Sequence, residues 1–240
     1  LIGGLAGDAI TTGSYNNAFG HASLSTATTG EQNAAFGRYS LNLNTTGSEN
    51  TALGNHALNS NTTADNNTAV GYYSLYANTT GTGNVALGAN ALDANTTAGG
   101  ITAVGAGSLT ANTTGAGNTA VGYQSLGVNT TGDRSIAVGS YTLDAQTTGR
   151  FNTAVGYSAG TEVTTGTHNT FLGDSSGATT TTGINNVAVG QSALNANTTA
   201  SNNTAVGMSA LVANTTGTAG TAVGKSALAA NTTGTDNTGL

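Results

Sequence analysis

The sequence predicts an all-β chain that coils into a parallel β-roll, a solenoid of short stacked strands. Three observations predict this fold. A glycine recurs every 17 residues from Gly3 to Gly224, which divides the chain into 14 repeats, here called rungs. A Thr-Thr pair recurs with the same period from Thr11 to Thr233. The apolar residues stand as adjacent pairs and lack the 3.6-residue spacing of a helix face.

The elements of one rung follow from the consensus N-T-A-V-G-x-x-A/S-L-x-A-N-T-T-G-x-x. In the fifth rung it predicts a strand at 68–71, a turn at 72–73, a second strand at 74–77 and an Asn-Thr-Thr-Gly arc. Constant rung length predicts parallel strands stacked in register about 4.8 Å apart, and hence a rod of roughly 65 to 70 Å. We expect residues 1–240 to form one continuous domain.

Two kinds of column, meaning equivalent positions in successive rungs, constrain the backbone. The glycine column, to which Gly71 belongs, predicts a conformation closed to residues with a Cβ, or close approach of the chain. Asn is frequent four residues before this glycine and seven after it, as at Asn67 and Asn78. Those Asn residues form hydrogen-bonded ladders or are simply favoured in turns; the sequence leaves both interpretations open. The Asn-Thr-Thr segments also match the N-x-T glycan acceptor, for which we favour a structural role.

Two positions of the repeat vary together. Rung 11 carries Phe171 where Ala is usual and Gly177 where Leu is usual, and rung 1 pairs Leu1 with Gly7. Exchanges of large for small indicate that both positions share one packed core. Rung 10, with Gly160, departs from this rule unless Phe171 also fills its space.

Composition limits the partners of the chain. Four Lys and Arg residues stand against ten Asp and Glu residues, which gives a net charge of -6. Too little positive charge is present for nucleic-acid binding. The longest apolar runs are only a few residues, so we expect no membrane span. The absence of Cys excludes disulfides and thiolate metal sites.

The sequence predicts no enzyme. His21, His56 and His168 occupy three different columns, so we do not expect them to converge on a metal or a catalytic triad. No glycine-rich phosphate loop opens a helix. We therefore expect no catalytic residue, cofactor or metal; a structural ion held by Asp65 or Asp133 is the less favoured alternative.

Four tyrosines are the candidate receptor contacts. Tyr72, Tyr123 and Tyr157 directly follow a glycine of the glycine column, and Tyr73 occupies the next position. Exposed Tyr offers apolar area with a hydrogen-bonding end, which suits contact with glycans or proteins. The alternative is that these positions are spacers without a common role.

Adjacent apolar residues predict an assembly of several chains. Successive side chains of a strand point to opposite faces, so Ala69 and Val70 place apolar atoms on both faces. One face can line the interior of the roll, and the other needs a partner; the sequence does not say which is which. A uniform stripe suits rotational symmetry about the rod axis, so we expect a homo-oligomer.

The segment N-T-A-V-G-Y-Q-S-L, from Asn118 to Leu126, resembles the S-V-A-I-G-x-x-S/A repeats in the head domains of trimeric autotransporter adhesins. The 17-residue form with N-T-T-G is similar to repeats of bacterial surface proteins and bacteriophage tail fibres. This resemblance covers the whole chain. It implies a left-handed β-roll, three chains side by side, and an extracellular location on a bacterial cell surface or a virion. Two departures are a longer rung and Thr68 where the family usually has Val.

The expected function is that of a structural shaft segment in a surface adhesin or tail fibre, which extends and presents attachment to a host or surface. Its expected partners are two further copies in a homotrimer, with a host surface glycan or protein as a further candidate. One alternative is an ice-binding solenoid that uses the Thr-Thr ladder. Against it, adjacent threonines in a strand face opposite ways. A second alternative is a ligand-binding shaft that uses the Tyr columns.

Overall fold

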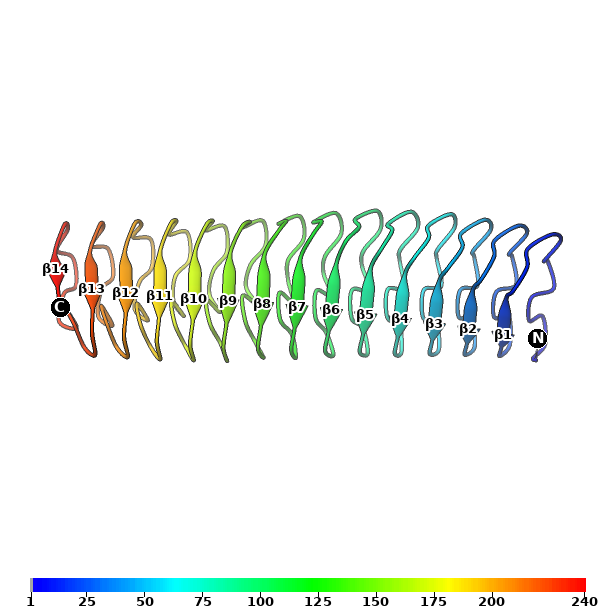
Figure 1. Cartoon of the computed structure of the whole chain (residues 1–240), viewed down its shortest axis with the longest axis horizontal. Coiled ribbons are helices and arrows are strands. Elements are labelled where there is room, and N and C mark those ends of the chain that lie inside the picture. Colours follow the sequence, from blue (N-terminus) through cyan, green and yellow to red (C-terminus); the bar gives the residue numbers. More distant parts are fainter. Residues whose placement is uncertain (1) are drawn as a thin grey trace. The chain divides into compact units, whose positions relative to one another are not determined.

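The computed structural model describes residues 2–240, and its regular elements are short β-strands joined by turns (Figure 1). No described residue lies in a helix. The 14 strands lie about 17 residues apart along the chain. Their bounds are β1 Asn17–Phe19, β2 Ala34–Phe36, β3 Thr51–Leu53, β4 Thr68–Val70, β5 Val85–Leu87, β6 Thr102–Val104, β7 Thr119–Val121, β8 Ile136–Val138, β9 Thr153–Val155, β10 Thr170–Leu172, β11 Val187–Val189, β12 Thr204–Val206, β13 Thr221–Val223 and β14 Thr238–Gly239.

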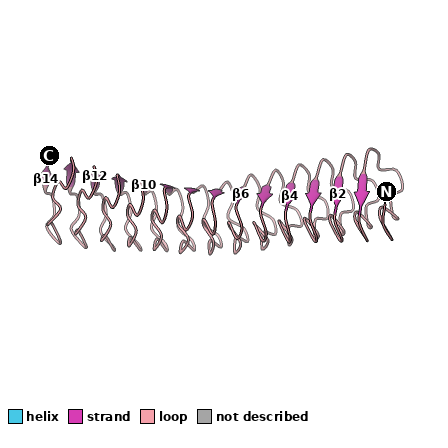
Figure 2. Cartoon of the chain, turned by 90° about the horizontal axis from the view of Figure 1, so that it is seen from below, coloured by secondary structure: helices cyan, strands magenta, loops and turns pink. Residues whose placement is uncertain are grey.

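The chain forms two compact units, Leu1–Asn118 with β1 to β6 and Thr119–Leu240 with β7 to β14. Within each unit consecutive strands pair in parallel and in register, as Ala52 does with Ala69. Figure 2 shows the strands of each unit side by side, with loops completing the coils. The prediction of a parallel β-solenoid with 17-residue rungs is confirmed. The single continuous domain over 1–240 stays a prediction.

The prediction of a second strand at 74–77 is wrong, because the chain forms a turn there. Leu75 has a φ of 51°, in the left-handed region, and the Ser74 N–H donates to the Gly71 carbonyl across a turn. The segment still pairs with the next rung: the Leu75 N–H donates to the Ala91 carbonyl at 2.9 Å. This side of the coil is therefore stacked by hydrogen bonds between turns.

The glycine column meets both conditions that the sequence predicts for it. Gly71 has a φ of 135°, which side-chain-bearing residues rarely adopt. A Cβ at this position would also lie 2.5 Å from the carbonyl oxygen of Gly88 in the next rung. Any other residue here would have to change the backbone and push the rungs apart.

The core of each unit is lined by alanines and leucines. The Ala69 side chain in the middle of β4 is fully buried, and so is the Leu75 side chain on the turn opposite. The Val70 side chain is partly exposed, and the equivalent side chains of Leu53 and Leu87 are nearly half exposed. The structure thus decides a point that the sequence leaves open: Ala and Leu fill the interior, and the Val column faces outward.

The two Asn columns form hydrogen-bonded ladders. The Oδ1 atom of Asn67 accepts from the Asn84 backbone N–H at 3.0 Å, and its Nδ2 atom donates to the Gly81 carbonyl at 2.9 Å. In the second column, the Nδ2 atom of Asn78 donates to Asn61 Oδ1 and to the same Gly81 carbonyl. These side chains are fully buried. The ladder interpretation is confirmed, and a glycan could not reach Asn78 in the folded chain.

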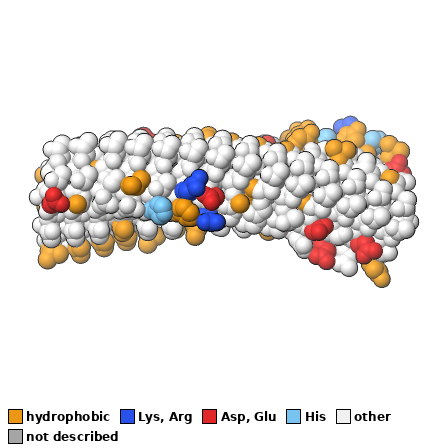
Figure 3. Space-filling model, turned by 90° about the horizontal axis from the view of Figure 1, so that it is seen from above, with side chains coloured by type: hydrophobic (Ala, Val, Ile, Leu, Met, Phe, Trp, Pro, Cys, Tyr) orange, Lys and Arg blue, Asp and Glu red, His pale blue; other side chains and the backbone are white. Residues whose placement is uncertain are grey.

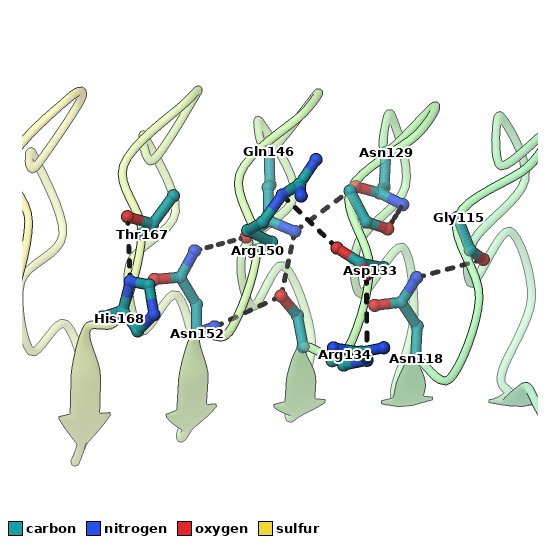
Figure 4. A network of polar contacts seen from close by, with 12 residues as sticks. Gly115, Asn118, Asn129, Asp133, Arg134, Gln146, Arg150, Asn152, Thr167 and His168 are labelled. Carbon is teal, nitrogen blue, oxygen red and sulfur yellow. Dashed lines mark hydrogen bonds and ion pairs between the residues drawn. The ribbon is translucent and has the colours of Figure 1, made fainter.

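A shorter residue in one ladder is compensated by a longer one in the other. Ser135 stands where the first column usually has Asn, and Gln146 stands in the second column of the same rung. The Gln146 Nε2 atom donates to the Ser135 hydroxyl at 3.3 Å, and its Oε1 atom accepts from Asn152 Nδ2 at 2.8 Å (Figure 4). The extra methylene therefore closes the gap that Ser135 leaves.

The large residue Phe171 fills the space of two missing leucines. A Cβ on Gly177 would lie 2.4 Å from the Phe171 ring, and a Cβ on Gly160 would lie 2.7 Å from it. The Phe171 side chain is fully buried. The predicted exchange of large for small is confirmed in rung 11, and it also accounts for rung 10. The pair of Leu1 and Gly7 lies in part outside the described residues.

We expect Phe171→Ala to destabilise the chain by about 3 to 5 kcal/mol, because it opens a cavity next to two glycines. Adding Gly177→Leu should restore much of this loss, since the leucine column already adopts the φ that Gly177 has (58°). The midpoint of guanidinium unfolding measures both effects. A double variant as unstable as Phe171→Ala alone would contradict this packing account.

We expect Asn67→Ala to destabilise the chain by about 1 to 3 kcal/mol, because it leaves the Asn84 N–H buried without its acceptor, whereas the Gly81 carbonyl still accepts from Asn78. Thr80→Ala, at an exposed position of the same rung, is the matched control. The same unfolding measurement applies, and equal midpoints for the two variants would speak against the ladder's role.

Candidate functional site

The outer strand face is the broadest candidate surface. In β4, Thr68 and Val70 flank the buried Ala69 and point away from the core. None of the described strands, β1 to β14, carries a charged residue. The apolar outer side chains form a stripe in each unit: Phe19, Phe36, Leu53, Val70, Leu87 and Val104 in the first, and Val121, Val138, Val155, Leu172, Val189, Val206 and Val223 in the second. An uncharged apolar stripe of this length is typical of an interaction surface.

Two of the predicted tyrosines join an aromatic cluster in the first unit, defined here as His21, Tyr39, His56, Tyr72, Tyr73 and Tyr76. The ring centroids of Tyr72 and Tyr73 are 4.5 Å apart. Tyr73 also packs against His56 at 4.8 Å and against Tyr76 at 4.7 Å. Tyr72 is 56% exposed. Tyr72 and Tyr73 therefore pack together in one cluster, whereas spacer positions without a common role would not need to pack together.

The cluster continues along the rungs through Tyr39 and His56 in the column of Tyr73, and it ends at His21 in the column of Tyr72. Tyr39 packs against His56 at 5.0 Å and against His21 at 5.4 Å. The Arg38 guanidinium lies 4.6 Å from the centre of the Tyr39 ring. Sequence reasoning did not single out His21, His56 or Arg38 for contact. The signal was present, since Tyr39, His56 and Tyr73 follow one another at intervals of 17 residues.

The other two predicted tyrosines lie in the second unit. Tyr123 and Tyr157 both pack edge-on against Tyr141, with ring centroids 5.4 and 6.1 Å away. Tyr123 is 47% exposed and Tyr157 is 58% exposed. The structure thus joins Tyr123 and Tyr157 through a third ring.

The environment of His56 disfavours its charged form. Burial lowers the pKa of the imidazole below its usual 6.5, and the nearby Arg38 guanidinium lowers the pKa further. The His56 Nδ1 atom is buried without a hydrogen-bond partner among the described residues. Within the aromatic cluster, the neutral imidazole therefore acts as a packing ring.

We expect the folded chain to lose stability as the pH falls from 6.5 through the lowered pKa of His56. In that range the unfolded chain takes up a proton more readily than the folded chain, so acid favours unfolding. His56→Phe keeps a ring between Tyr39 and Tyr73 but does not titrate. Melting temperatures at pH 7.5 and pH 5 should therefore differ more for the wild type than for His56→Phe, and equal differences would contradict the prediction.

The residues considered above for ion binding and for ice binding form contacts within the protein. The Asp65 carboxylate accepts the Ser48 backbone N–H at 2.7 Å. Asp133 lies next to two arginine side chains. The described part of the chain holds no group of three or more His, Asp or Glu residues suited to a metal. In the pair Thr79 and Thr80, the Thr79 hydroxyl donates to the Thr96 carbonyl at 3.0 Å, and only Thr80 is exposed.

Comparisons with known proteins identify no family. No protein-family model, no curated protein and no solved structure matches the chain. The described residues form no helix that is long and apolar enough to cross a membrane.

Proposed function

We propose that the chain is a shaft segment of an extracellular fibre, built from three copies side by side. In this proposal the coil is left-handed, and the fibre belongs to a bacterial surface adhesin or a phage tail fibre that presents attachment to a host or surface. The observation that carries it is the uncharged apolar stripe on the outer strand face. The four tyrosines Tyr72, Tyr73, Tyr123 and Tyr157 are its proposed contacts with a host glycan or protein.

The apolar stripe supports assembly because its side chains do not form part of the core of one chain. The Ala69 and Leu75 side chains are already fully buried within one chain. Outer residues such as Leu53 and Leu172 remain 49% and 47% exposed. A surface that repeats with every rung is best covered by one with the same repeat, and a second copy of the chain has it. Closed rotational symmetry would leave no stripe uncovered.

The magnitudes also favour assembly. Covering the exposed part of one Val or Leu per rung contributes about 1 kcal/mol. Over all strands this amounts to on the order of 10 kcal/mol per interface. Association of proteins costs roughly 4 to 15 kcal/mol in lost freedom. The stripe alone is therefore comparable with that cost, and it has no charged groups that would need desolvation.

The mass in solution tests this proposal. We expect light scattering after gel filtration to give three times the 23.2 kDa of one chain. Val189→Glu combined with Val206→Glu should lower the mass to that of one chain, because it buries charge in the interface. Thr199→Glu, at an exposed arc position, is the control and should keep the trimer. A monomeric wild type, or a trimer that tolerates both glutamates, would refute the proposed assembly.

A further inference from the structure

Half of the chain's positive side chains lie together in the second unit. Of four basic residues in the sequence, Arg134 and Arg150 stand in successive rungs on either side of the Asp133 carboxylate (Figure 4). On the face drawn in Figure 3, basic, acidic, histidine and hydrophobic side chains gather in one group. We call Asp133, Arg134, Arg150, Phe151 and His168 the arginine patch.

The Asp133 carboxylate forms an ion pair with one nitrogen atom of each arginine, so the other guanidinium N–H groups do not contact it. Its Oδ2 atom lies 3.9 Å from Arg134 Nε, and its Oδ1 atom lies 3.4 Å from Arg150 Nε. Both ion pairs run through Nε. The side chains of Arg134 and Arg150 are 69% and 53% exposed, against 25% for Asp133. Two arginines and one aspartate leave a local charge of +1 on a chain whose net charge is -6.

Flat groups are stacked beside this charge. The Arg134 guanidinium lies 5.6 Å from the centre of the Phe151 ring, and the Phe151 and His168 rings are stacked with centroids 4.9 Å apart. Backbone hydrogen bonds between rungs fix these positions, since the Phe151 N–H donates to the Asp133 carbonyl and the His168 N–H donates to the Arg150 carbonyl. Phe151 is half-buried and His168 is exposed.

We propose that the arginine patch binds a carboxylate-bearing sugar of an acidic glycan. The terminal N–H groups of Arg150 and Arg134 suit the two oxygens of a carboxylate. The Phe151 and His168 rings offer a flat apolar surface next to them, on which the less polar face of a sugar ring can pack. A bare anion would use the arginines but gain nothing from the rings. Two arginines are too few to hold a nucleic-acid backbone.

This inference deepens the proposed attachment role and rests on it, because it names the class of glycan that the fibre would meet. All five residues belong to one chain. Sugar binding can therefore be measured whether or not the chain forms a trimer. A result against the proposed trimer is thus distinguishable from a result against the proposed sugar site.

Isothermal titration calorimetry with the full chain tests the site, with trigalacturonate and trisialic acid as probes and their methyl esters as neutral counterparts. We expect at least one acid to bind at low salt, to weaken as salt rises, and to bind at least tenfold more tightly than its ester. Arg150→Gln and Phe151→Ala should each weaken binding about tenfold or more. Lys225→Gln, which removes an exposed positive charge outside the arginine patch, should leave binding unchanged.

Circular dichroism and the mass in solution show whether each variant keeps its fold and assembly. If Phe151→Ala loses its fold, Phe151→Leu serves in its place, since it keeps a large apolar side chain but not the flat ring. Four results would overturn the proposal: no binding of either acid, equal binding of acid and ester, equal losses for Lys225→Gln and Arg150→Gln, or tighter binding of a glutamate-rich peptide than of both sugars.

Discussion

Hydrogen bonding between neighbouring rungs is the constraint on which the rest of the structure depends. The strands are only two or three residues long, too short to stand alone. Each rung instead satisfies the polar groups of the next, through strand pairs, turn pairs and the two Asn ladders. The Oδ1 atoms of the ladders accept from residues 17 positions further along the chain. One inserted residue would shift these partners together, which explains why the rung length never varies.

The same constraint explains how the repeat tolerates change. A close-packed interior leaves no room for an uncompensated loss of volume, and a buried polar group without a partner is costly. Phe171 accordingly occupies the space left by Gly160 and Gly177. Gln146 reaches the Ser135 hydroxyl where an Asn is missing. Apolar and polar columns thus follow one rule, in which a change in one column is offset in a column that touches it.

Stacking also turns single residues into extended surfaces. A side chain at an exposed position of one rung contacts the side chain at the equivalent position of the next rung. The aromatic cluster and the arginine patch both arise in this way, from Tyr39, His56 and Tyr73 in one case and from Arg134, Phe151 and His168 in the other. Binding surfaces can therefore change along the solenoid while its interior keeps the same Ala and Leu columns.

The sequence by itself determined the period, the parallel register, the role of Gly71 and the coupling of Phe171 to its neighbours. All of these follow from spacing or residue volume, which the chain displays directly. Only the tertiary structure decided that 74–77 turns, because nothing in Leu75 signals a left-handed backbone. It also decided that Val70 faces outward, since both members of an apolar pair look alike in sequence.

The candidate surfaces divide in the same way. Recurrence at 17 residues was enough to place Tyr73 next to His56, because register alone makes them neighbours. Tyr76 joins that cluster only because the turn brings its position back toward Tyr73. The ion pair between Asp133 and Arg150 needs the register and also a particular direction for each side chain. Residue spacing fixes which rungs touch, whereas the direction of a side chain depends on backbone angles that only the packed coil imposes.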